Sequence, residues 1–128
     1  MDKLTRLVGR VIFGIPFLIF GAGHLMNADK MAGMVPSFVP GGVIWIYFTG
    51  VAMIVAAVAI ITGIKGRAAA FGLALMLLGF VVAIHLPGLA NPDAQMKMMA
   101  FVNLMKDTAL MGAALVIGVS FEPSAKKK

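Results

Sequence analysis

The sequence predicts an all-α integral membrane protein, an antiparallel four-helix bundle with both termini in the cytoplasm. Of its 128 residues, 61% are hydrophobic and 12% are charged, and the mean hydropathy is +1.00. An average soluble domain is about half apolar and about a quarter charged, so this chain has too few polar side chains to cover a globular surface. Its apolar residues also gather into four segments of about 20 residues, the length at which an α-helix crosses the hydrocarbon of a bilayer.

The four predicted spans are interpreted as helices. They cover residues 7–26, 42–62, 68–86 and 101–120. Strands of a membrane barrel would alternate polar and apolar residues, and segments such as VAMIVAAVAIITG do not. We expect one transmembrane domain over residues 1–128, with a basic tail at 121–128. The first span also resembles a secretory signal, but Arg10 interrupts it and no clean cleavage site follows, so we expect it to stay uncleaved.

Helix-breaking residues separate the spans. The first loop, residues 27–41, contains the apolar run MVPSFVP, which is expected to lie on the outer membrane surface or to cover the outer end of the bundle. Residues 63–67 form a tight second loop. Pro87 and Gly88 end the third span, and Asn91 is expected to cap the fourth helix with Pro92 at its first position. Within the first span, Pro16 predicts a bend.

Small residues predict where the helices pack, because helices in lipid associate by close van der Waals contact. In the first two spans these residues are Gly14, Gly21, Gly50, Ala56 and Ala57. In the third and fourth spans they are Ala68, Gly72, Gly79, Ala83, Thr108, Ala109, Gly112 and Ala113. They indicate a compact bundle and specify no chemistry.

The formal net charge of +6 is interpreted as a sign of membrane orientation. Cytoplasmic loops of membrane proteins are enriched in Lys and Arg. One side carries Lys3, Arg6, Arg10, Lys65, Arg67 and the terminal Lys126, Lys127 and Lys128. The other side carries Lys30, Lys97 and Lys106, balanced by Asp29, Asp93 and Asp107. This asymmetry predicts cytoplasmic termini in a bacterial-type inner membrane, with the lipid bilayer rather than nucleic acid as the partner of the basic ends.

Candidate functional residues are the polar groups at membrane depth, which are costly there. All of them fall in the outer half of the predicted bundle: His24, His85, Asn103, Lys106 and Asp107, with Trp45 and Tyr47 as aromatic neighbours. Asn103, Lys106 and Asp107 share one helical face through their spacing of three and four residues. The short side chain of Asp107 cannot reach the interface, so it needs a partner, such as a histidine of the first or third span, or a proton.

The residues leave several interpretations of this site open. The histidines could be ordinary interfacial side chains, hydrogen-bonding groups for a quinone-like head group, or ligands of a haem or a metal. His24, Met26 and His85 are the metal candidates, and the outer methionines Met96, Met98 and Met99 suit Cu(I), although methionine is also a common packing residue. A quinone is favoured over haem or copper. The absence of cysteine excludes thiolate catalysis and Cys-based clusters.

Four segments of the chain resemble the DoxX family. They are FGIPFLIFGAGHL, MVPSFVP, IYFTGVAMIVAAVAIITG followed by Gly66 and Arg67, and NLMKDTALMGAALVIG with its Lys106–Asp107 pair. The resemblance covers about residues 6–120 and implies a small four-helix inner-membrane protein associated with membrane redox systems, the family being named after a thiosulfate:quinone oxidoreductase subunit. Many DoxX-like proteins carry an acidic residue in the second helix, where this chain has Met53 and no acid in the whole span.

The resulting functional hypothesis is a quinone-linked or redox-accessory subunit with an outward-facing polar pocket. The sequence leaves undecided whether the protein is an enzyme, and without cysteine or a nucleotide motif the chain would need a bound cofactor to carry electrons. The alternatives are a membrane protein that binds or transports haem, a metal or a small amphiphile, and a purely structural subunit. Four short helices have few internal faces, so we expect a homodimer or a place in a larger complex.

Overall fold

The computed structural model describes residues 2–121, and these residues form helices and no strand. The elements are α1 (Lys3–Met26), α2 (Ala28–Met31), η1 (Ala32–Met34), α3 (Val43–Thr62), α4 (Gly66–Phe80), the π-helical turn η2 (Val81–His85), α5 (Leu86–Gly88) and α6 (Ala94–Ser120). Helices α1, α3 and α6 and the continuous segment Gly66–Gly88 are long and apolar enough to cross a membrane. The prediction of an all-helical chain with four spans of membrane length is therefore confirmed.

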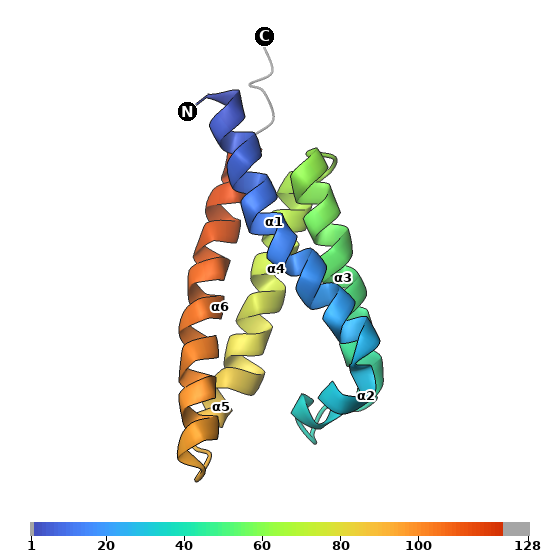
Figure 1. The fold of residues 1–128 in the computed structure, drawn as a ribbon, viewed down its shortest axis with the longest axis vertical. Helices are drawn as coiled ribbons and strands as arrows, with labels where there is room; N and C mark the ends of the chain where they lie inside the picture. The colour runs from blue at the N-terminus through green and yellow to red at the C-terminus, as the bar shows by residue number, and fades with distance from the viewer. Residues whose placement is uncertain (1, 122–128) are drawn as a thin grey trace.

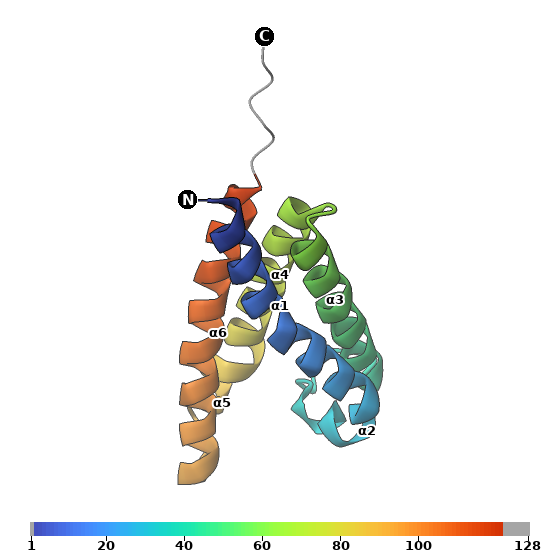
Figure 2. The ribbon, with the colours of Figure 1, turned by 45° about the horizontal axis from the view of Figure 1, so that its top comes forward.

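The long helices pack as a chain of neighbours. Helix α1 lies along α3, α3 contacts α4, and α4 lies along α6. Successive long helices run in opposite directions, and both ribbon views place the start of α1 beside the end of α6 and the end of α1 beside α3 (Figures 1 and 2). Helices α3 and α4 lie close together at their connecting turn and diverge toward the end that carries α2 and α5 (Figure 1).

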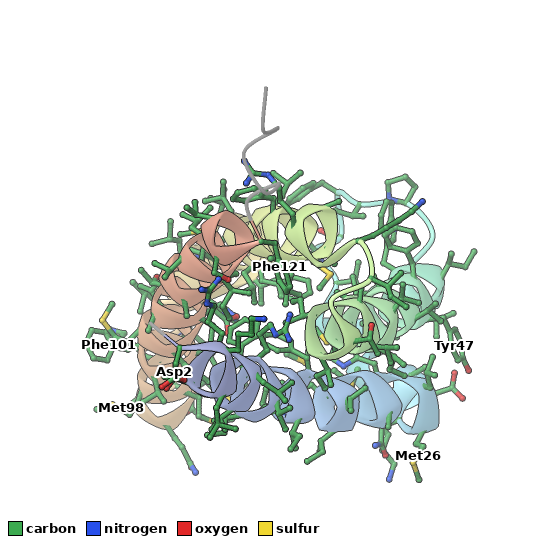
Figure 3. All side chains as sticks on the ribbon, turned by 90° about the horizontal axis from the view of Figure 1, so that it is seen from above. Asp2, Met26, Tyr47, Met98, Phe101 and Phe121 are labelled. Carbon is green, nitrogen blue, oxygen red and sulfur yellow. The ribbon has the colours of Figure 1, made fainter. Side chains whose placement is uncertain are left out.

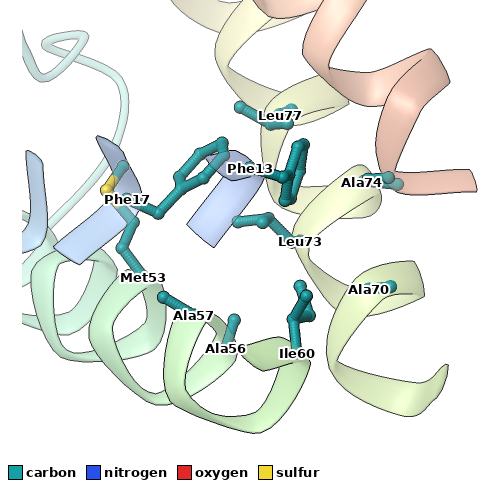
Figure 4. Packing of buried hydrophobic residues seen from close by; sticks show 11 residues of the cluster. Phe13, Phe17, Met53, Ala56, Ala57, Ile60, Ala70, Leu73, Ala74 and Leu77 are labelled. Carbon is teal, nitrogen blue, oxygen red and sulfur yellow. The ribbon is translucent and has the colours of Figure 1, made fainter. Parts of the chain in front are cut away.

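The buried core lies where α1, α3 and α4 meet. Phe13 and Phe17 of α1 extend between the other two helices, against side chains such as Ile60 and Leu73 (Figure 4). The ring centroids of the two phenylalanines are 5.1 Å apart, in a tilted arrangement. Ala57 and Ala70, fully buried, let the helix backbones approach. This close contact is what holds helices together where the surroundings are themselves apolar.

Glycines allow the closest helix contacts, although only part of the predicted set does so. A Cβ on Gly21 would lie 2.7 Å from the backbone oxygen of Gly50, and one on Gly14 would lie 2.8 Å from Ile61. The prediction is wrong for Gly72, Gly79 and Gly112, whose Cβ would meet nothing within 4 Å in residues 2–121. Helices α4 and α6 instead approach at Gly118, which packs on the ring of Phe71.

The predicted cap of the fourth helix is corrected by the hydrogen bonds at its start. Helix α6 is capped by Asp93, whose carboxylate accepts from the backbone N–H of Gln95 and of Met96, while Asn91 accepts from the N–H of Asp93 itself. The predicted cap at Asn91 is therefore wrong. The third helical segment continues through Pro87 to Gly88. Residues 122–128, with the terminal lysines of the predicted cytoplasmic tail, lie outside the described residues.

The predicted first loop is partly helical. Residues 28–34 form the short elements α2 and η1, and the chain then reverses through residues 35–42. Gly41 and Gly42 have φ values of 101° and 46°, which disfavour side chains larger than glycine. The Nε1–H of Trp45 donates to the carbonyl oxygen of Pro40 at 2.6 Å and so ties this loop to α3.

Candidate functional site

A hydrogen-bonded pair of His85 and Asp107 lies between the third helical segment and α6. Nε2 of His85 lies 2.7 Å from Oδ2 of Asp107. His85 is 8% exposed and Asp107 is 6% exposed, and they are the buried polar residues of the described chain. Burial without a partner would cost each group several kcal/mol, of order 2–7 for a neutral polar group. Of the alternatives that the sequence left for Asp107, a partner such as a histidine or a proton, the structure shows a histidine partner, and it is His85.

The π-helical turn η2 presents His85 to α6. Its backbone bonds run one residue longer than those of an α-helix, with the N–H of Leu86 donating to the carbonyl oxygen of Val81. One extra residue in a turn shifts the following side chains by about 100° around the helix axis. Pro87 comes two residues after His85 and has no N–H to continue the α-helical pattern. Such turns frequently occur at functional sites.

Lys106 connects the pair to α1. Its Nζ lies 3.9 Å from Oδ1 of Asp107, donates to Oδ1 of Asn103 at 3.4 Å, and stands 5.0 Å from the centroid of the Phe20 ring. The carboxylate of Asp107 therefore has the histidine on one oxygen and the ammonium near the other. Since the Lys106 side chain is 45% exposed, its attraction to Asp107 is weaker than that of a buried ion pair.

His24 does not join the His85–Asp107 pair. Its Nδ1–H donates to the carbonyl oxygen of Phe20, one turn earlier in α1, at 2.7 Å. A carbonyl only accepts, so Nδ1 carries the proton, and in the neutral ring Nε2 is a free acceptor. Within residues 2–121 no hydrogen bond or ion pair links His24 to His85 or Asp107.

The polar residues described above line one cavity of about 910 Å³. Six of the seven predicted ligand-binding residues line it: His24, Trp45, His85, Asn103, Lys106 and Asp107. Tyr47 does not line it, and its side chain lies at the outer edge of the molecule beside α3 (Figure 3). Thr49 is a further polar lining residue, although its hydroxyl donates to the carbonyl oxygen of Trp45 in its own helix.

Most of the cavity wall is apolar, and part of it is open to the outside. Phe48 and Val55 of α3 and Leu75 of α4 line the cavity while their residues are 61%, 61% and 69% exposed. Gly72 and Gly79 also line it and, having no side chain, leave space between the two helices. The polar end is therefore continuous with an apolar groove along the diverging α3 and α4.

The loop after α1 closes one end of this space. Met31, Met34, Val35, Pro36 and Val39 all line the cavity. The predicted apolar loop thus lies over the cavity, in the place that a lid would take. The hydrogen bond of Trp45 to Pro40 fixes it there.

Of the three predicted metal candidates, His24 and His85 line the cavity and Met26 does not. In the part of the chain that the structure describes, no group of three or more His, Cys, Asp or Glu side chains could hold a metal ion. Met26 is 83% exposed, and Figure 3 shows Met26 and Met98 on different sides of the molecule, both at its outer edge. Nε2 of His85 is engaged by Asp107, which leaves Nδ1 as its other ring nitrogen. The described residues thus provide no cluster of three such ligands, and haem and copper stay alternatives that the sequence predicted.

Sequence reasoning did not find two features of this site. Phe20 lies beneath the ammonium of Lys106, and its only signal in the sequence is its place in one stripe of α1 with Phe17 and His24. The π-helical turn at 81–85 gives no signal in the sequence apart from the nearby Pro87. The contact between Phe20 and Lys106 joins segments that are far apart in the chain.

The fold and the site together define an all-helical protein with four helices of membrane-spanning length and a buried His–Asp pair at the polar end of an apolar cavity. The chain belongs to the family described as a domain of unknown function, DUF8561, whose model matches residues 13–118. No curated protein and no solved structure matches the chain significantly. The matched region includes every residue that lines the cavity.

Proposed function

We propose that the protein is an inner-membrane four-helix bundle whose cavity binds an amphiphile with a quinone-like head group, and that it serves as an accessory subunit of a membrane redox system. The observation that carries the proposal is the continuity of the cavity, which joins a cluster of polar groups to an open apolar groove. A ligand that fits both parts has a small polar head and a long apolar tail. The resemblance to the DoxX family favours a quinone within this class.

The orientation follows from the charges. Lys3, Arg6, Arg10, Lys65 and Arg67 all belong to the end of the molecule where α1 begins, α6 ends and α3 turns into α4. At the other end each cation of the described chain has a nearby acid in the sequence. By the positive-inside rule the first end is cytoplasmic, so both termini lie in the cytoplasm and the cavity opens toward the outer leaflet.

The polar groups suit both redox forms of a quinone. A quinone presents carbonyl oxygens, for which the ammonium of Lys106 and the amide N–H groups of Asn103 are donors. A quinol presents hydroxyl groups, and these can donate hydrogen bonds to Nε2 of His24, because Nδ1 of that ring donates to Phe20. Asp107 holds His85 in one orientation through the bond to Nε2, and the remaining Nδ1 is the ring nitrogen available to a ligand.

In this role the chain binds the ligand and positions a proton. Oxidation of a quinol releases two protons and two electrons, and this chain contains no cysteine to take up electrons. The electron acceptor would belong to a partner protein, in keeping with an accessory role. A homodimer or a larger membrane complex would supply that partner.

A ligand-binding measurement on the purified protein tests the proposal. In lipid nanodiscs, a short-chain ubiquinone or menaquinone analogue at 100 times its Kd should stabilise the folded protein by about 2.7 kcal/mol. The effect should fall in His85→Ala and Asp107→Asn and persist in the matched control Tyr47→Phe, which changes a residue outside the cavity. Equal stabilisation by an alkane chain without the head group would refute the quinone assignment, and no stabilisation by either ligand would refute binding altogether.

A further inference from the structure

A second cavity lies at the opposite end of the molecule and is lined by cations. Its volume is about 390 Å³, and its lining residues are Lys3, Arg6, Arg10, Ser120 and Phe121. Its lining residues belong to the start of α1 and the end of α6, which lie side by side (Figure 1), and none of them lines the first cavity. Nothing in the proposed quinone-binding role uses this cavity.

Packing holds the guanidinium of Arg10 in place at this cavity. Its Cζ stands 5.0 Å from the centroid of the Phe121 ring, within the range of a cation–π interaction. A Cβ on Gly63 would lie 3.1 Å from Nη1 of Arg10, and one on Gly66 would lie 2.5 Å from the Phe121 ring. The two glycines of the α3–α4 turn therefore leave the room that Arg10 and Phe121 occupy.

Arg10 also has an unused donor. Its Nε is buried and has no hydrogen-bond partner within the described residues 2–121. Buried donors in folded proteins are nearly always paired, because an unpaired one costs about 1–3 kcal/mol. Of the acids in residues 2–121, only Asp2 belongs to this end, and its carboxylate accepts from the backbone N–H of Thr5 at 2.6 Å.

The geometry points to a binding site for a phosphate group in this cavity, and we propose that its occupant is the head group of an anionic phospholipid of the cytoplasmic leaflet. Arginine presents a planar fork of N–H donors that matches the oxygens of a phosphate. Lys3 and Arg6 add charge at the rim of the same cavity. The site lies at the end of the helices, where the head groups of a bilayer surrounding them would lie.

Native mass spectrometry of the detergent-purified protein tests this assignment. With phosphatidylglycerol and phosphatidylcholine supplied in equal amounts, the wild type should retain phosphatidylglycerol in preference. Arg10→Lys keeps the charge but removes the Nε–H and the fork, and Arg10→Gln removes the charge as well, so each should weaken retention about tenfold. The matched control Lys97→Gln, at the other end of the molecule, should bind as the wild type does.

The outcomes separate the sources of the phosphate. Lys3→Gln serves as a second variant in case Arg10→Gln fails to fold. It changes an exposed residue, leaves the Arg10 packing intact and should also weaken retention of phosphatidylglycerol. If millimolar inorganic phosphate displaced the lipid, the cavity would be a phosphate-binding site, but its assignment to a lipid head group would be overturned. Equal retention of both lipids, or unchanged retention in Arg10→Lys and Lys3→Gln, would overturn the proposal. Quinone binding is measured separately, so failure of one proposal leaves the other intact.

Discussion

The coupling between His85 and Asp107 can be measured by a double-mutant cycle. Asp107→Ala leaves Nε2 of His85 buried without its acceptor, and His85→Ala leaves the carboxylate with only the ammonium of Lys106 at 3.9 Å. Because each change removes one partner of a buried pair, we expect each to lower the free energy of unfolding by about 3 kcal/mol. Packing losses that are the same with and without the partner cancel in the cycle.

The expected coupling energy follows from the geometry. Hydrogen bonds between membrane helices contribute about 0.6 kcal/mol on average and about 1.7 kcal/mol at most. The His85–Asp107 contact is short, at 2.7 Å, and both residues are less than a tenth exposed. We therefore expect a coupling near the upper end, about 1.5 kcal/mol.

Reversible unfolding by sodium dodecyl sulfate in mixed micelles or bicelles provides the assay. The matched control is a cycle of Tyr47→Phe and Asp107→Ala, because Tyr47 does not line the cavity and lies at the outer edge of the molecule. That control should be additive within about 0.5 kcal/mol. A His85–Asp107 coupling within the error of the control would show that the contact does not stabilise the fold, and the structural reasoning would then be refuted.

Two further predictions concern α1. Gly21→Ala should lower the free energy of unfolding by about 1–3 kcal/mol in the same assay, because its Cβ would lie 2.7 Å from the Gly50 oxygen. The control Gly23→Ala, whose Cβ would have nothing within 4 Å, should leave that free energy unchanged. Equal effects of the two variants would contradict the close contact at Gly21. The N–H of Thr5 holds the pKa of Asp2 below its ordinary value of 3.8. Protection of the first turn by this cap is therefore present above pH 3.8 and lost as the pH falls through the lower pKa of the folded protein. Amide exchange at Thr5 should show that loss in the wild type and a pH-independent cap in Asp2→Asn.

The sequence alone determined the class of the fold. Low charge content and four apolar segments leave helices as the structures that satisfy every backbone hydrogen bond in lipid, and the predicted spans at 42–62 and 101–120 end where α3 and α6 end. The starts were less accurate. Polar first turns such as Lys3–Arg6 and Ala94–Lys97 are helical without being apolar, so hydropathy did not detect them.

The polar residues of the site were also predictable, because ionisable groups inside apolar segments are few and are costly to bury. The sequence could say that Asp107 needed a partner. It could not say which histidine, since His24 and His85 lie at similar depths and the choice depends on which helices touch. Helix α4 packs on α6, while α1 packs on α3. Because of this arrangement of the helices, Asp107 of α6 pairs with His85.

The tertiary structure alone decided the shapes of the two cavities. Gly72 and Gly79 have the spacing of a packing face, yet they border open space because α3 and α4 diverge. Arg10 is one of several cations in the sequence, and only the meeting of α1, the Gly63 turn and Phe121 buries its Nε. Composition and hydropathy determine which segments are helices of membrane-spanning length, whereas a cavity depends on the angle between helices, which is set by contacts distant in the chain.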